Sequence, residues 1–127
     1  MVERGAAAVM GDADQTCGMS IAIDVVGGKW KMHLMWVLAE GPVRFGQIRR
    51  KLDGVSEKVL AENLRQLEAS GVVHRELYAE VPPRVEYSLT PLGESLNEAL
   101  MPLEAWGDRH RDEVLSRAES VAAPSAA

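Results

Sequence analysis

Residues 45–71 read FGQIRRKLDGVSEKVLAENLRQLEASG, and the pattern of this stretch decides the fold. Phe45, Ile48 and Leu52 recur at the spacing of one helical face, which predicts a short helix. The dipeptide Asp53-Gly54 is a strong turn signal and ends that helix. A second helix therefore has to begin within a few residues of the first.

Ser56 begins this second helix, because its hydroxyl can accept a hydrogen bond from a backbone N–H group in the first turn. Leu60, Leu64 and Leu67 follow at i, i+4 and i+7 and form an apolar stripe. Gly71 is a natural residue for the end of the helix. A short helix, a tight turn and a second helix with an unoccupied polar face make up the helix-turn-helix pattern.

A β-hairpin is predicted directly after the second helix. The segments VVHRELY (72–78) and RVEYSL (84–89) are rich in β-formers, and in the second one Val85, Tyr87 and Leu89 alternate with polar residues. The AEVPP segment between them contains two prolines, which suit a stiff loop and not the interior of a sheet. The hairpin turns the pattern into a winged helix-turn-helix, and the predicted fold class is mainly α with a small β part (α+β).

Apolar helices are predicted on both sides of this unit. Residues 19–26 form a short apolar run that suits a buried helix of about two turns. Residues 30–40 carry apolar groups on almost every face, so this helix should be surrounded by protein. Thr90-Pro91 supplies an N-cap and a first-turn proline for a last, long helix, and Pro102 should bend or break that helix near residues 99–101.

The composition is that of one globular domain. The chain has 127 residues, of which 46% are hydrophobic and 26% charged, and no apolar run reaches the roughly 18 residues of a membrane span. The N-terminus lacks the features of a secretory signal, so the expected location is the cytoplasm, with no membrane partner. We expect residues 17–115 to form the domain, and residues 1–16 and 116–127 to be disordered tails.

Charge is distributed unevenly along the chain. The formal net charge of −5 argues mildly against a nucleic-acid partner. Residues 29–58 are nevertheless net positive, whereas acids outnumber bases from Glu94 onward. The middle of the chain therefore offers a local positive field that the net charge conceals.

The run from Cys17 to about Trp106 resembles the HxlR family of bacterial winged-helix transcriptional regulators, which are MarR-like. Four blocks carry the resemblance in the right order: a lone Cys ahead of DVVGGKW; GPVRFGQIRRKLDGVS; KVLAENLRQLEASGVVHR; and YAEVPPRVEYSLTPLGESL. The resemblance implies a homodimer, with N- and C-terminal dimerisation helices, that presents two winged helices to successive half-sites of a palindromic operator in double-stranded DNA. We accordingly expect a DNA-binding transcriptional regulator, and a repressor rather than an activator.

Residues that could contact DNA lie on both helices of the central stretch and in the hairpin. They are Ser56, Glu57, Lys58, Ala61, Glu62 and Arg65 on the second helix, Arg49, Arg50 and Lys51 before it, and Pro82, Pro83 and Arg84 in the wing. Lys58 and Glu62 could read a G·C pair, or could simply pair with each other at i and i+4 on a solvated face. Ala61 and Glu62 depart from the small polar residue and the amide that are common in the family, so the operator cannot be inferred from that of relatives.

Cys17 is the only cysteine, which excludes an intramolecular disulfide and a Cys-rich zinc site. A thiol at the start of a helix is activated by the helix dipole, and the family resemblance adds that thiols here often sense oxidants or electrophiles such as quinones. An inert core thiol is the alternative. A thiol enzyme would rest on Cys17 alone, and no motif places a base beside it, so we expect no enzyme, no cofactor and no metal site.

A further set of residues could line a pocket for a small hydrophobic effector, or could equally form a plain dimer core. These are Trp30, Met32, His33, Met35, Trp36, Leu103 and Trp106. The rival to DNA binding is a winged-helix protein-interaction module, in which the helix 56–70 docks a partner protein through its acidic positions.

Overall fold

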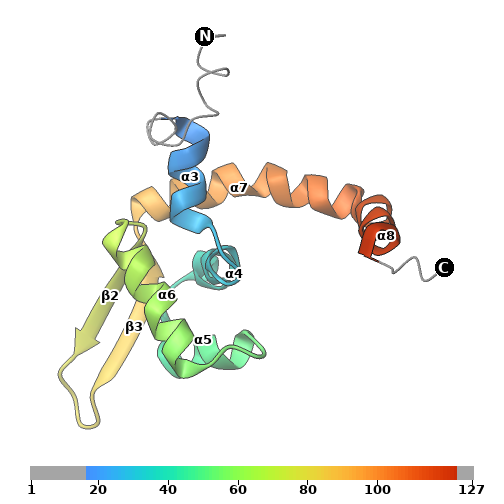
Figure 1. The fold of residues 1–127 in the computed structure, drawn as a ribbon. Coiled ribbons are helices and arrows are strands. Elements are labelled where there is room, and N and C mark those ends of the chain that lie inside the picture. Colours follow the sequence, from blue (N-terminus) through green and yellow to red (C-terminus); the bar gives the residue numbers. More distant parts are fainter. Residues whose placement is uncertain (1–16, 123–127) are drawn as a thin grey trace.

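The structure is a computed structural model that describes residues 17–122, so the predicted N-terminal tail, residues 1–16, lies outside the described residues (Figure 1). Its elements are α3 (Gly18–Val26), α4 (Lys31–Val37), the 3-10 helix η1 (Leu38–Glu40), β1 (Val43–Arg44), α5 (Phe45–Lys51), α6 (Glu57–Ala69), β2 (Val73–Tyr78), β3 (Arg84–Leu89), α7 (Pro91–Arg109) and α8 (Arg111–Ala122). The fold is mainly helical with one small antiparallel sheet, which confirms the predicted class.

Helices α5 and α6 form the predicted helix-turn-helix. The turn between them contains Gly54 at φ +91°, a left-handed conformation that glycine adopts without strain. Ser56 caps α6, because its Oγ accepts a hydrogen bond from the Val59 N–H at 3.2 Å. Leu60 and Leu64, like Leu67 one turn further on, have no exposed surface. The stripe inferred from the sequence is thus the inner face of α6.

The predicted hairpin is formed by β2 and β3, which pair from Val73 opposite Leu89 to Tyr78 opposite Arg84. Figure 1 shows this hairpin, the wing, projecting from the body of the protein beside α6. The two-residue strand β1 adds to the other edge of β3, giving the strand order β1-β3-β2. The sequence did not indicate β1, because two residues are too few for a periodic pattern.

The hydrophobic core lies between the helix-turn-helix, α4 and the sheet. Its largest fully buried side chains are Leu34, Met35, Leu38, Ile48, Leu60, Leu64 and Leu67, and Tyr87 of the wing packs against the same cluster. The sheet face expected to be inward is inward, since Val85 and Leu89 also contact this core. A single core supports both the recognition elements and the wing.

Helix α3 corrects one prediction, because it is not buried. Met19 is 70% exposed, Ile21 51% and Ile23 54%, and only Val26 of this helix is buried. An apolar face predicts that something covers it, but does not say whether the cover belongs to the same chain. Helix α4 is likewise only partly surrounded, since Trp36 is 67% exposed.

Helices α7 and α8 correct two further predictions, one at Pro102 and one on the C-terminal tail. Of the bend or break predicted at Pro102, the break does not occur, because α7 is one continuous helix from Pro91 to Arg109. Pro102 lies on the exposed side, where water can hydrogen bond the carbonyl that its missing N–H leaves unpaired. Residues 116–122, predicted to be tail, belong to α8. Asp112 and Glu113 stabilise this helix because their negative charges lie at the positive end of its dipole. The carboxylate of Glu113 also lies 3.4 Å from Nε of Arg117, at i+4.

No helix within residues 17–122 combines the length and the apolar character needed to cross a bilayer.

The start of α7 is joined tightly to the end of α6 and to β2. Thr90 Oγ1 accepts from the Gly93 N–H at 3.0 Å and donates to the Gly71 carbonyl at 2.7 Å, while the Thr90 N–H donates to the Val72 carbonyl at 3.1 Å. Gly93 is buried against that carbonyl so closely that a Cβ atom would lie 2.1 Å from the Val72 oxygen. Only glycine permits α7 to begin here.

Replacing Gly93 with alanine should therefore destabilise the protein, by about 1–3 kcal/mol, because the backbone of β2 or α7 has to shift. Gly107→Ala is the matched control on the same helix, since a Cβ atom there meets nothing within 4 Å. This control should stabilise the protein by about 0.5–1 kcal/mol through the higher helix propensity of alanine. Urea denaturation at one protein concentration measures both changes, and equal midpoints for the two variants would contradict the packing described.

Candidate nucleic-acid interface

The outer face of α6 carries the residues predicted to meet bases. Ser56, Glu57, Lys58, Glu62 and Arg65 are all exposed, and Ala61 is half-buried. They face outward because the three leucines of the helix occupy the core. This side of α6 presents a charged and polar surface with both signs of charge.

The basic residues before and on α6 differ in how far they are engaged. Arg49 pairs with Glu57, with Nη1 and Oε2 3.1 Å apart, and so links α5 to the first turn of α6. Within residues 17–122 no ion pair involves Arg50, Lys51 or Lys58, nor Arg65. The i, i+4 pair that was the alternative role of Lys58 and Glu62 is thus not formed in the described part of the chain.

Arg84 is held inside the wing. Its guanidinium lies 2.7 Å from a Glu80 carboxylate oxygen and 2.5 Å from one of Glu86, and stacks 3.7 Å from the centroid of the Tyr78 ring. The hydrogen bond from Arg84 lowers the pKa of Glu80, and the hydrogen bond to Glu80 raises the pKa of Arg84. Arg84 therefore shapes the base of the tip, while Pro82 and Pro83 are exposed beyond it.

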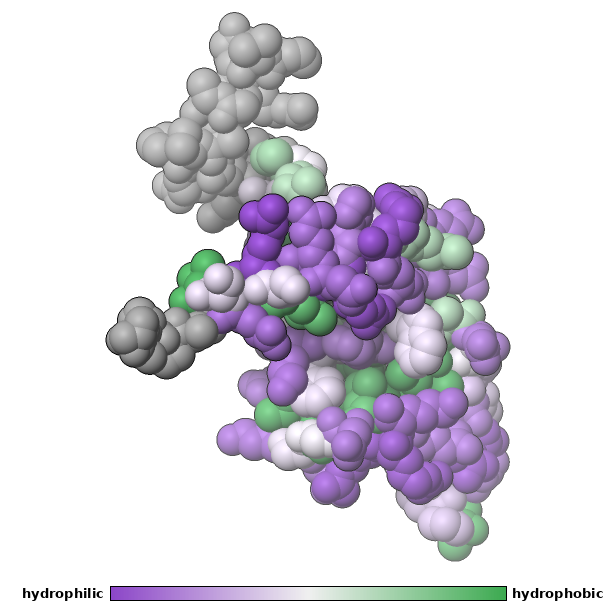
Figure 2. Space-filling model, turned by 90° about the vertical axis from the view of Figure 1, so that its right-hand side faces the viewer, coloured by the Kyte–Doolittle hydropathy of each residue, from purple (hydrophilic) through white to green (hydrophobic). Residues whose placement is uncertain are grey.

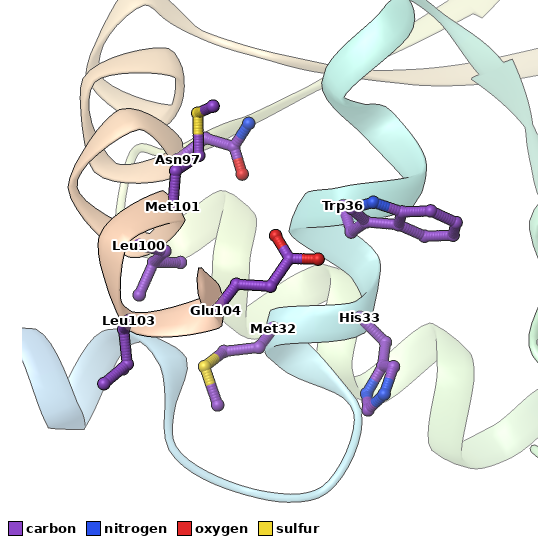
Figure 3. Close-up of a pocket in the computed structure, with 8 residues that line it drawn as sticks. All are labelled: Met32, His33, Trp36, Asn97, Leu100, Met101, Leu103 and Glu104. Carbon is purple, nitrogen blue, oxygen red and sulfur yellow. The ribbon is translucent and has the colours of Figure 1, made fainter. Parts of the chain in front are cut away.

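Only some of the residues predicted to form an effector pocket lie together. Met32, His33, Trp36 and Leu103 line one cleft, between α4 and α7 (Figure 3). Met35 is instead fully buried in the core and Trp30 packs against that core. Trp106 is half-exposed further along α7, its ring 4.9 Å from that of His110.

Four lining residues of this cleft were not predicted: Asn97, Leu100, Met101 and Glu104. The predicted pocket was based mainly on apolar side chains and therefore did not include Glu104 or Asn97. Their spacing was a usable signal, because Asn97 and Met101, like Leu100 and Glu104, are four residues apart and so share one side of a helix.

Cys17 is the N-cap residue of α3 and is half-buried. Its carbonyl accepts the Ile21 N–H at 2.9 Å, which places the residue at the positive end of the helix dipole. Across residues 17–122 no three His, Cys, Asp or Glu side chains gather where they could hold a metal ion.

A capped helix with an outward polar face, preceded by a short helix and flanked by a hairpin, defines a winged helix-turn-helix DNA-binding protein. The chain belongs to the HxlR-like helix-turn-helix family, whose model matches residues 25–115. The expected family is therefore confirmed.

Known proteins similar to the chain are transcriptional regulators. It is 43% identical over 96 residues to the HTH-type transcriptional regulator YybR of Bacillus subtilis (strain 168), covering 76% of this chain and 77% of YybR. The structure of the redox regulator HypR in its reduced form matches with a TM-score of 0.74 and 42% identity, over 77% of this chain and 97% of HypR. The reduced form of YodB from B. subtilis matches with a TM-score of 0.66 and 34% identity, over 74% of this chain and 92% of YodB. The chain is accordingly a helix-turn-helix transcriptional regulator and not an enzyme.

The wing contact gives a titration that can be tested. Arg84→Ala should raise the pKa of Glu80 toward its ordinary value, because the hydrogen bond from Arg84 is the main cause of the lowering. A carboxyl whose pKa is lower in the folded state contributes stability above its ordinary pKa, and loses that contribution as the pH falls through the lowered value. NMR titration of the Glu80 carboxyl carbon measures the shift.

Arg75→Ala, on the same hairpin, is the matched control and should leave the Glu80 midpoint in place. A Glu80 midpoint that is the same in the wild type and in Arg84→Ala would refute the role of Arg84 in the wing.

Proposed function

We propose that the protein acts as a homodimeric repressor in the bacterial cytoplasm, binding a palindromic operator in double-stranded DNA. The observation that carries the proposal is the outer face of α6, where Lys58 and Arg65 are exposed and form no ion pair within residues 17–122. Lysine can bond guanine edges and a carboxylate such as that of Glu62 can accept from cytosine. Occupation of the operator would block polymerase without any further chemistry.

Phosphate contacts come in this proposal from the basic end of α5. Arg50 and Lys51 are exposed beside the turn that leads into α6, and Arg49 fixes that turn through Glu57. The wing approaches the minor groove or the adjacent backbone with its proline tip, and Arg84 holds the tip in shape. Base reading is thus assigned to α6 and positioning to α5 and the wing.

Two copies are proposed because the first and last helices leave apolar side chains uncovered. Met19, Ile21 and Ile23 of α3, and Leu92 of α7, are all more than half exposed. A twofold dimer built on them would present two α6 helices to the two halves of a palindrome.

The rival proposal, a module that docks a partner protein through α6, has less support. It relied on the acidic positions of that helix, and Glu57 is already paired with Arg49. The relatives named above are transcriptional regulators.

Cys17 is proposed as a sensor of oxidants or electrophiles. The N-cap position favours the thiolate, which is the form that adds to the electrophilic carbon of a quinone or attacks an oxidant. HypR, similar in fold and sequence, is described as a redox regulator. A modified Cys17 would disturb α3, and through the proposed dimer it would change the spacing of the two α6 helices. The cleft between α4 and α7 is proposed as a second input, for a small hydrophobic effector.

DNA binding is tested by gel shift with the DNA upstream of the chain's own gene. Reduced protein should form a specific complex whose affinity falls with salt, by about 0.9 log units per log unit of salt for each phosphate neutralised. Lys51→Ala should reduce that slope by about 0.9, the share of one phosphate. Arg117→Ala, on α8 and paired with Glu113, is the control that leaves the slope unchanged. Absence of a specific complex, or binding insensitive to salt, would overturn the proposal.

The sensor is tested by repeating that gel shift after treatment with diamide or a quinone. The treated wild type should lose operator affinity, because diamide oxidises the Cys17 thiols of two copies to an intermolecular disulfide and is reduced to the hydrazine, while a quinone alkylates the thiolate. Cys17→Ser should keep its affinity, because the serine hydroxyl undergoes neither reaction under these conditions. Recovery of the diamide-treated protein with a thiol reductant serves as the control for denaturation. Equal loss of affinity in Cys17→Ser would show that the signal acts elsewhere.

A further inference from the structure

The cleft between α4 and α7 has the size of a small-molecule site. Its volume is about 480 Å³, within the range of pockets that bind drug-sized ligands. Figure 2 shows hydrophobic residues gathered in a hollow on the side of the molecule that carries α8, surrounded by hydrophilic residues. The cleft is accessible from outside in the single chain, since Trp36 and Met101 are both more than half exposed.

The charge of the cleft is what distinguishes it from a plain apolar groove. Glu104 is the only acid among the lining residues, and no lysine or arginine lines the cleft. In the described part of the chain Glu104 takes part in no ion pair. Figure 3 shows its carboxylate pointing from α7 toward Trp36 on α4, across the mouth of the cleft. The Glu104 carboxylate thus faces walls made of apolar side chains, the Asn97 amide and the His33 imidazole.

The walls suit a cation with an apolar body. The indole of Trp36 offers the aromatic face that attracts cations most strongly. Met32 and Met101 contribute flexible, polarisable thioethers that adapt to aromatic groups. The amide of Asn97 adds a carbonyl acceptor without charge. An anion would meet the Glu104 carboxylate with no lysine or arginine to compensate; the remaining titratable lining residue is His33, whose Nδ1 donates to the Lys29 carbonyl at 3.1 Å.

We propose that this cleft binds a lipophilic organic monocation, with Glu104 as its charge partner and Trp36 and the two methionines as its apolar walls. A second copy of the chain is a less suitable occupant, because an apolar surface laid over Glu104 would bury a carboxylate without a partner. Binding of the cation does not depend on the proposed function; only its effect on DNA binding rests on that proposal. The ligand would contact α4, which packs against α6, and α7, which carries part of the proposed dimer surface.

The experiment uses the full chain and two ions of the same shape and opposite charge, tetraphenylphosphonium and tetraphenylborate. Isothermal titration should show saturable binding of the phosphonium, at least about tenfold tighter than that of the borate. Glu104→Gln keeps the size of the side chain and removes the charge, so it should weaken phosphonium binding by about tenfold and narrow the difference between the two ions. Glu98→Gln, an acid on the same helix outside the cleft, is the matched control and should leave binding unchanged.

Trp36→Ala provides an independent readout, because it should weaken the phosphonium while Trp106→Ala should not. Absence of phosphonium binding, equal affinity for the two ions, or indifference to Glu104→Gln would each overturn the proposal. Sedimentation of the same samples measures the oligomeric state, and phosphonium binding confined to the monomer would mean that a second copy covers the cleft and would also overturn the proposal. None of these results depends on DNA, so failure here leaves the gel shift as a separate test of the proposed function.

Discussion

The burial of three leucines on one side of α6 is the constraint on which the rest of the structure depends. Leu60, Leu64 and Leu67 are completely removed from solvent, so α6 cannot rotate without exposing apolar surface. That constraint decides which residues of the helix face outward. The same cluster receives Tyr87 from the wing and Leu34 from α4. Helix α6, the wing and the helix α4 that lines the cleft are therefore packed on one core and cannot be repositioned independently.

Sequence reasoning predicted the winged helix-turn-helix nearly in full because its signals are local. The cap at Ser56, the leucine spacing and the alternation in β3 each depend on neighbours a few residues away, and each is found as predicted. The features that the sequence did not predict depend on residues far away in the chain or outside it. Strand β1 forms only through its pairing with β3. The apolar side chains of α3 are exposed because the described part of the chain does not cover them.

The exposure of the candidate DNA-contacting residues of α6 was predictable from the sequence, whereas their ion pairs were not. Position along the helix identified Lys58 and Arg65 as outward, which the structure agrees with. Pairing could not be predicted, because the partners of Arg84 come from the tip and the strand of a folded hairpin. Two of the basic residues expected to contact DNA, Arg49 and Arg84, form ion pairs within the protein. Glu104 was not predicted for a similar reason, because its role as a charge in the cleft depends on the side chains of α4 that lie opposite it.

The junction at Thr90 has a mechanical consequence. Thr90 caps α7 and also hydrogen bonds the carbonyls of Gly71 and Val72, which lie between α6 and β2. The first turn of α7 is therefore fixed to the winged helix-turn-helix. With 19 residues, α7 is an arm of about 28 Å, and the cleft at Glu104 lies about 20 Å from the clamp. A displacement of about 2 Å at the far end then corresponds to a tilt of about 4° at the junction. In the proposed regulator, α7 acts as a lever that converts a short movement at the cleft into a rotation of the helix-turn-helix, without any loop having to fold or unfold.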